Sequence, residues 1–242
     1  MLPAVEQSLQ PATKTAPLRT GAEYIRSIKA DGRRVFLNGE EVRDITIHPA
    51  FRGAVQTIAR LYDIAADPAN RAKMTFASPI TGDPVLRCFQ IPKTSFDLAA
   101  RRIFSEAWAE PTFGLMGRTP DHVAGFFSGW AAKPSVMARG GKQFADNLLR
   151  FFAYEREHHQ YLSYVIVPPQ IDRSKPAHKQ SDPSLYAGIV KERDDGIVLR
   201  GAQQLGTGAI LSDWLQISCI TPLAAGDEAY AINVVVPINA PG

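Results

Sequence analysis

The spacing of apolar residues changes once along this chain, and this change constrains the fold more than any other feature. Up to about residue 160, apolar side chains recur at helical spacing, as on one face of an amphipathic α-helix. After that point, short β-rich runs are separated by turn signals such as Asp195-Gly196 and Gly226-Asp227. The pattern therefore predicts a helical first part and a β-rich second part.

Local signals predict the elements of the first part. Thr20-Gly21-Ala22-Glu23 has the spacing of a capping box, in which the threonine and glutamate side chains bond each other's backbone N–H groups at a helix start. Asn38-Gly39 is typical of a two-residue hairpin turn. Further helices are expected at residues 48–62, 95–108, 123–132 and 141–161.

The second part reads as a series of short strands, the first of which stops at Pro168-Pro169. Regular short strands with turns between them are typical of an antiparallel barrel or sandwich. We therefore expect an α+β chain with a flexible arm at residues 1–19, a helical N-terminal domain at 20–150 and a β-barrel domain at 151–242. The strands are expected at residues 164–167, 186–190, 196–200, 214–220 and 229–236.

Composition excludes several classes of protein. The formal net charge is +3 and the basic residues are scattered, which does not favour nucleic acid as a partner. No segment approaches the roughly 20 apolar residues of a membrane span. Cys88 and Cys219 are far apart, so we expect buried thiols in a cytoplasmic protein rather than a disulfide framework or a metal site. The pair His158-His159 lies at the end of a charged helix. We expect it to be a solvated turn rather than a metal site.

The segment from Met116 to His122 is the best candidate for a functional site. Arg118 stands directly before a predicted helix, with Thr119 as a candidate N-cap and Asp121 favoured by the positive end of the helix dipole. Pro120 suits the first helical position. An arginine beside a helix N-terminus can bind a carboxylate or phenolate, but it can also pair with a nearby acid for structural reasons.

The chain resembles a known family of enzymes along nearly all of its length after residue 19. It is similar to the 4-hydroxyphenylacetate 3-hydroxylase family, the oxygenase components of two-component aromatic monooxygenases that use FADH2. The order and number of the matching stretches make the resemblance specific. They are Thr20–Tyr24, Val42–Phe51, Met116–Asp121, Ile171–Arg173, Asp195–Val198 with Gly201-Ala202, and Pro237–Gly242.

The resemblance implies a fold related to the acyl-CoA dehydrogenases, with a helical domain, a middle β-barrel and a C-terminal helical bundle. It implies hydroxylation of a phenol ortho to its hydroxyl, with FADH2 and O2 as co-substrates. A separate NAD(P)H:flavin reductase would supply the FADH2, and the full-length protein would be a homo-oligomer, a tetramer. On this reading the chain is cut short after Gly242, so its barrel is incomplete and the C-terminal bundle is absent.

The resemblance also implies roles for particular residues. Arg118 would hold the phenol oxygen, where a positive charge favours the reactive phenolate. The type member has a tyrosine at the position of His122 and a histidine at that of Tyr164, so the polar pair is exchanged here. The exchange either preserves a hydrogen-bonded triad with Arg118 or marks a different aromatic substrate. Thr221 would lie in a substrate-side loop, and flavin contacts would come from Gln170, Ile171, Asp172, Arg173, Thr207, Gly208 and Ala209.

Two other functions stay open at this stage. Related flavin and iron–sulfur dehydratases act on hydroxyacyl-CoA, but they need clustered cysteines, and none lies near Arg118 or His122. The chain could instead be a truncated, non-catalytic module that binds a ligand or a partner but does not retain flavin. The lack of a Gly-rich phosphate loop or a Rossmann fingerprint predicts that NADH does not bind here.

Overall fold

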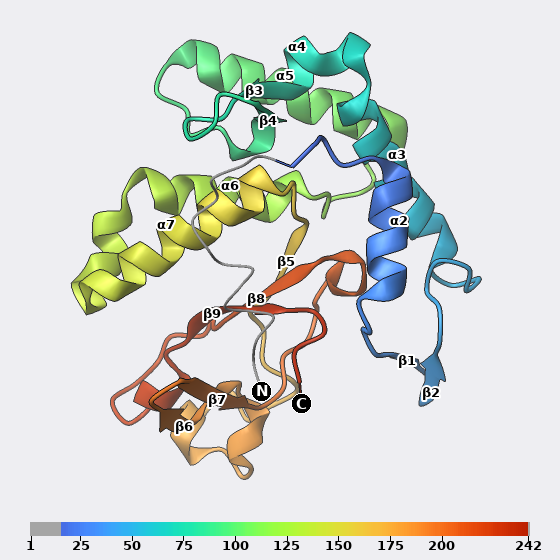
Figure 1. Ribbon diagram of the computed structural model, residues 1–242. Helices are drawn as coiled ribbons and strands as arrows, with labels where there is room; N and C mark the ends of the chain where they lie inside the picture. The colour runs from blue at the N-terminus through green and yellow to red at the C-terminus, as the bar shows by residue number, and fades with distance from the viewer. Residues whose placement is uncertain (1–15, 242) are drawn as a thin grey trace. The chain divides into compact units, whose positions relative to one another are not determined.

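The computed structural model describes residues 16–241, which divide into two compact units (Figure 1). Unit 1 ends at Tyr161, and unit 2 begins at Leu162. Residues 1–15 of the arm expected at residues 1–19 lie outside the described residues. In the remaining part of this arm, the backbone N–H of Ala16 donates to the carbonyl of Glu157 at 2.9 Å. No helix in the described part of the chain is long and apolar enough to cross a membrane.

Unit 1 is built from α-helices and two short hairpins. The capping box at Thr20 and Glu23 is confirmed, and a second one is formed by Thr94 and Asp97. One-turn and longer 3-10 segments at residues 68–70, 87–89, 110–112 and 134–140 connect the helices. The helices are α2 (Gly21–Ala30), α3 (Arg52–Ala66), α4 (Arg71–Met74), α5 (Ser95–Ala109), α6 (Asp121–Ala132) and α7 (Lys142–Glu157).

The Asn38-Gly39 turn is also confirmed. It joins β1 (Val35–Leu37) to β2 (Glu40–Val42), and both turn residues have positive φ, 53° and 87°, as this kind of turn requires. A second hairpin, β3 (Thr75–Ala77) with β4 (Pro84–Leu86), was not expected from the sequence.

An aromatic cluster forms the centre of unit 1. Four almost fully buried rings form a chain of contacts in the order Tyr24, Tyr62, Trp108 and Phe104. The indole N–H of Trp108 donates to the carbonyl of Leu61 at 2.9 Å, so burial leaves this polar group satisfied. These contacts join α2, α3 and α5.

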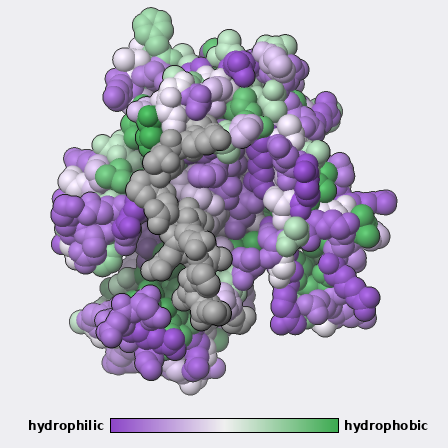
Figure 2. All heavy atoms as spheres, viewed as in Figure 1, coloured by the Kyte–Doolittle hydropathy of each residue, from purple (hydrophilic) through white to green (hydrophobic). Residues whose placement is uncertain are grey.

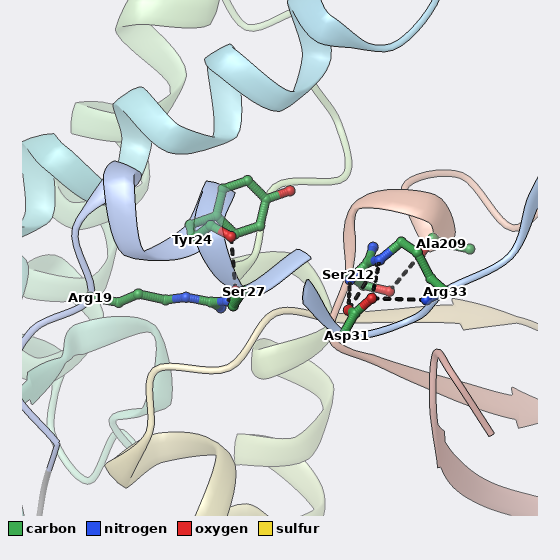
Figure 3. A network of polar contacts seen from close by, with 7 residues as sticks. All are labelled: Arg19, Tyr24, Ser27, Asp31, Arg33, Ala209 and Ser212. Carbon is green, nitrogen blue, oxygen red and sulfur yellow. Dashed lines mark hydrogen bonds and ion pairs between the residues drawn. The ribbon is translucent and has the colours of Figure 1, made fainter. Parts of the chain in front are cut away.

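Helices α2 and α3 also approach each other closely at Gly21. A Cβ atom at this position would lie 2.5 Å from the carbonyl oxygen of Ala59, so only glycine fits. The N–H of Gly21 donates to the carboxylate of Asp63 at 2.8 Å. Figure 3 shows polar contacts at the two ends of α2. Arg19, which precedes the helix, donates to the hydroxyl of Ser27, and Asp31 and Arg33, which follow the helix, form an ion pair.

The end of α7 differs from the sequence-based expectation. The His158-His159 region was expected to be solvated, but Glu155, Glu157 and His159 are fully buried. Glu157 accepts hydrogen bonds from Ser78 at 2.7 Å and from Arg156 at 2.8 Å, which compensates for the loss of water. The expectation was wrong because one of these partners, Ser78, is 79 residues away in the sequence.

Unit 2 holds a three-stranded sheet and a separate hairpin. In the sheet, β5 (Leu162–Val165) pairs in parallel with β8 (Trp214–Ser218), which pairs antiparallel with β9 (Asn233–Pro237). The hairpin joins β6 (Gly188–Arg193) to β7 (Gly196–Arg200). Short 3-10 segments lie at residues 177–179, 183–185, 209–211 and 228–230.

Residues 162–241 do not form a closed barrel, so the expected antiparallel barrel stays a prediction. The strands make two separate sheets, and the β5–β8 pair is parallel. Pro168 and Pro169 have no N–H to donate, so regular pairing of β5 does not continue past them, and only an isolated bridge links Val167 to Gln204. On the face drawn in Figure 2, most residues are hydrophilic and apolar ones are scattered among them.

Candidate active site

Arg118 occupies the turn that leads into α6, and its backbone carbonyl is hydrogen-bonded to a buried side chain of unit 1. The residue is half-buried. The hydroxyl of Tyr161 donates to the carbonyl of Arg118, and the guanidinium donates to the carbonyl of Gly117 at 3.0 Å. Helices α6 and α7 contact each other, and the bond from Tyr161 to Arg118 places the turn before α6 near the end of α7 (Figure 1). The arginine is thus fixed at a helix start.

The start of α6 differs in detail from the prediction. The helix begins at Asp121 with Pro120 as its N-cap residue, so Thr119 is not the N-cap. Pro120 already has helical dihedral angles, −56° and −24°, and the carbonyl of Thr119 accepts from the N–H of His122 at 3.0 Å. The hydroxyl of Thr119 donates instead to the carboxylate of Asp121. This carboxylate lies in the first turn, as expected from the helix dipole.

His122 lies one residue inside α6 and is half-buried, with its ring edge-on to Phe126 at a centroid distance of 4.9 Å. Burial lowers the pKa of His122, the positive charge of Arg118 lowers it further, and Asp121 partly opposes both effects. The imidazole is therefore neutral at pH 7. A neutral imidazole can donate one hydrogen bond and accept another.

Tyr164 lies on β5 in unit 2, opposite Gln216 of β8, and is half-buried. Because Arg118 and His122 belong to unit 1, the predicted triad of these three residues stays a prediction. Thr221, the predicted substrate-side residue, follows β8, is half-buried, and its carbonyl accepts from the thiol of Cys219 at 3.5 Å. Cys219 is only half-buried, whereas Cys88 is buried as expected.

The first predicted flavin stretch, Gln170 to Arg173, forms an exposed turn with Ile171 half-buried. The carboxylate of Asp172 accepts from the N–H and hydroxyl of Ser174 and pairs with Lys175 at 3.0 Å. These hydrogen bonds, led by the Ser174 hydroxyl, lower the pKa of Asp172 to about 2. Asp172 therefore builds the turn, and it is the exposed side chains of Gln170 and Arg173 that are available to a ligand.

The second predicted flavin stretch, Thr207 to Ala209, is a tight turn in which Gly208 has a φ of 83°. The backbone N–H groups of Thr207 and Ala209 donate within the turn, to the carbonyls of Leu205 and Gly206, both at 2.9 Å. The carbonyl of Thr207 accepts from the hydroxyl of Ser163 at 2.8 Å. The exposed hydroxyl of Thr207 forms no hydrogen bond with the described residues, so it can serve a polar ligand.

Comparison with known proteins agrees with the resemblance seen in the sequence. Residues 20–242 match the family model described as 4-hydroxyphenylacetate 3-hydroxylase N terminal. The chain belongs to this family. Its members in Geobacillus sp. (strain PA-9) and Thermus thermophilus, both 4-hydroxyphenylacetate 3-monooxygenase oxygenase components, are 34% and 37% identical to it over 93% of the chain. The chain spans about half the length of these relatives, 46% and 45%.

Solved structures from the hydroxylase family share the fold. The oxygenase component complexed with FAD and 4-hydroxyphenylacetate superposes with a TM-score of 0.84 at 36% identity, over 93% of this chain and 46% of that one. An archaeal 4-hydroxybutyryl-CoA dehydratase superposes with a TM-score of 0.78 at 24% identity, which shows a likeness of fold alone. The mixed helix and sheet architecture is therefore that of this hydroxylase family.

Sequence reasoning missed a histidine–aspartate pair in unit 2. The Nδ1 atom of His178 lies 2.8 Å from the carboxylate of Asp227, which is 1% exposed and also accepts from the N–H groups of His178 and Ala224. Burial would raise the pKa of Asp227, but these donors outweigh it and lower the pKa to about 2. The turn signal at Gly226-Asp227 was visible in the sequence, but its partner, 49 residues away, was not.

Proposed function

We propose that this chain is the N-terminal part of an oxygenase component that hydroxylates a phenol ortho to its hydroxyl group. The observation that carries the proposal is Arg118, which is held at the start of α6 beside a neutral His122 in a member of the hydroxylase family. A relative of known structure binds FAD and 4-hydroxyphenylacetate. Bound FADH2, on reaction with O2, would supply the electrophilic oxygen.

Arg118 is proposed to bind the phenol oxygen. A guanidinium stabilises the phenolate form of the ring, which is more nucleophilic at the ortho carbon. Its backbone is already anchored, so little reorganisation is needed when the substrate binds. A point charge that is fixed before the reaction lowers the barrier more than one that must be ordered during it.

His122 and Tyr164 are proposed to be hydrogen-bonding partners of the substrate. The lowered pKa of His122 keeps it neutral, so it can accept the phenol proton while Arg118 holds the oxygen. Tyr164 offers a hydroxyl that can donate or accept. Thr221 is proposed to contact the substrate on the unit 2 side.

Flavin is proposed to contact Gln170, Ile171 and Arg173 in one stretch and Thr207, Gly208 and Ala209 in the other. The fit rests on the exposed Thr207 hydroxyl, which has no hydrogen bond among residues 16–241, and on the exposed cation of Arg173. A hydroxyl suits the polar edge of the flavin ring, and a cation suits its pyrophosphate. Asp172 is proposed to act indirectly, by shaping the turn that presents Arg173.

We further propose the setting in which the full-length protein works. It is a cytoplasmic homo-oligomer that receives FADH2 from an NAD(P)H:flavin reductase, and unit 2 contributes strands to a middle barrel of the acyl-CoA dehydrogenase type.

The test is turnover of 4-hydroxyphenylacetate, as a probe phenol, by the full-length protein with a flavin reductase, NADH and O2. We expect a catechol product, formed in proportion to NADH oxidised. Release of hydrogen peroxide without loss of the phenol would contradict the proposed substrate class. Fluorescence titration of the 242-residue chain with FADH2 under anaerobic conditions tests the competing non-catalytic reading, which predicts no binding.

A further inference from the structure

We infer that Tyr161 is a positioning residue that sets the direction of Arg118. The inference rests on the proposed function of Arg118 and extends it to a residue that contacts neither substrate nor flavin. Tyr161 is 1% exposed, and its hydroxyl donates to the carbonyl oxygen of Arg118. The two residues are 43 positions apart, so the bond joins the end of α7 to the start of α6.

The backbone of Tyr161 is itself held firmly, which makes it a suitable anchor. Helix α7 ends in a Schellman-type turn, in which the N–H of Gln160 donates to the carbonyl of Glu155 at 3.0 Å. His159 takes the left-handed position of this turn, with a φ of 52°, where glycine is usual. A non-glycine residue keeps this conformation only when its surroundings fix it.

Two hydrogen bonds fix His159. The hydroxyl of Tyr62 donates to its carbonyl at 3.1 Å, and its ring Nε2 lies 3.1 Å from the carbonyl of Ala16. Because this carbonyl can only accept, Nε2 carries the proton. The turn that precedes Tyr161 is therefore pinned on both sides, by α3 and by the segment before α2.

The bond to the Arg118 carbonyl constrains the peptide plane between Arg118 and Thr119. The next carbonyl, that of Thr119, accepts from His122 at 3.0 Å as α6 begins. Successive carbonyls thus point to fixed partners, which holds the peptide planes on both sides of Thr119 and so limits the ψ angle of Arg118. Without the Tyr161 hydroxyl, this peptide plane loses its partner in unit 1 and the guanidinium samples more directions. Phenol binding should then weaken because ordering Arg118 costs entropy.

The substitution Tyr161→Phe removes the hydroxyl and keeps the ring that fills the core. Tyr62→Phe is a matched control, because Tyr62 is also 1% exposed and donates to a backbone carbonyl of the same unit. Tyr62→Phe removes a hydrogen bond from the turn before Tyr161 but leaves the bond from Tyr161 to the Arg118 carbonyl in place, so we expect a smaller effect from it. Both variants should be made in the full-length protein, which carries the complete active site.

We expect Tyr161→Phe to raise the KM for 4-hydroxyphenylacetate about fivefold, the factor that corresponds to one neutral hydrogen bond. Tyr62→Phe should leave this KM within about twofold. In an Arg118→Ala background, Tyr161→Phe should change the KM no further, because it acts through Arg118. An equal effect of the two tyrosine variants, or an undiminished effect in the Arg118→Ala background, overturns the inference.

Amide hydrogen exchange gives a second readout that does not depend on turnover. The amide of His122, which bonds the Thr119 carbonyl, should exchange faster in Tyr161→Phe than in Tyr62→Phe. Unchanged exchange at this amide overturns the inference whether or not the protein hydroxylates phenols. Failure of the unsubstituted protein to bind the phenol, with exchange altered as expected, contradicts the proposed function instead.

Discussion

The imidazole of His159 lies 3.1 Å from the carbonyl oxygen of Ala16, in a site from which water is excluded. Burial lowers the pKa of His159 to about 4. The hydrogen bond to Ala16 and the carboxylate of Glu157 oppose this shift without cancelling it. The bond links the first described residue of the chain to the end of α7. The protonation state of His159 therefore affects how this segment packs in unit 1.

The first prediction is a loss of stability in mild acid that depends on His159. Its pKa in the folded state, about 4, is below the usual 6.5, so the unfolded state binds more protons between these values. The stability is fully present above pH 6.5 and falls as the pH drops toward 4, by up to about 3 kcal/mol. Thermal melts of His159→Asn, whose asparagine tolerates the left-handed conformation, should show a smaller difference between pH 7 and pH 5. An unchanged difference would count against this account, and His48→Asn is the comparison variant.

The second prediction concerns Glu155, whose two carboxylate oxygens have no hydrogen-bond partner among residues 16–241. Burial raises the pKa of Glu155 well above its usual value, and Arg156 only partly opposes this. The unfolded state releases its proton above about pH 4.5, so stability decreases as the pH rises through this region. Glu155→Met should raise the melting temperature by several degrees at pH 8 and by less at pH 5. A lower melting temperature at both pH values would contradict this prediction.

The third prediction tests the His178–Asp227 pair of unit 2. One oxygen of Asp227 accepts from the N–H and the ring of His178, and the other accepts from the N–H of Ala224 at 2.8 Å. Asp227→Asn would turn an amide NH2 toward one of these donors, which should cost about 2 kcal/mol at pH 7. Chemical denaturation measures the loss.

The pH dependence supplies the control for this pair. The folded-state pKa of Asp227 is about 2, below its usual 3.8, so its contribution is present above pH 3.8 and is lost toward pH 2. The difference in stability between Asp227→Asn and the unsubstituted protein should therefore shrink in strong acid. A difference that is constant with pH would show that the carboxylate charge is not what stabilises the loop.

Signals that act within a few residues could be predicted from the sequence. The Thr20 capping box and the Asn38-Gly39 turn formed as predicted, because each depends on side chains and dihedral angles of neighbouring residues. Helix boundaries were less secure. Helix α3 begins at Arg52 rather than at His48, whose carbonyl instead closes a turn with Phe51 and Arg52.

Features that depend on distant residues could not be predicted. The charged end of α7 looked solvated because Ser78, Tyr62 and Ala16, which cover it, are far away in the sequence. The parallel pairing of β5 with β8 has no local signature either. Around the candidate site, Arg118 stood out through its place before a helix, whereas the hydrogen bond from Tyr161 became visible only in three dimensions.

The role of Arg118 is tested most directly by steady-state kinetics of Arg118→Ala in the full-length protein, with Arg139→Ala, an exposed arginine, as the control. Loss of a charge-assisted hydrogen bond to the phenolate should lower kcat/KM for 4-hydroxyphenylacetate by about 10- to 100-fold. The apparent affinity for FADH2 should change little. Equal kcat/KM values for Arg118→Ala and Arg139→Ala would contradict the account.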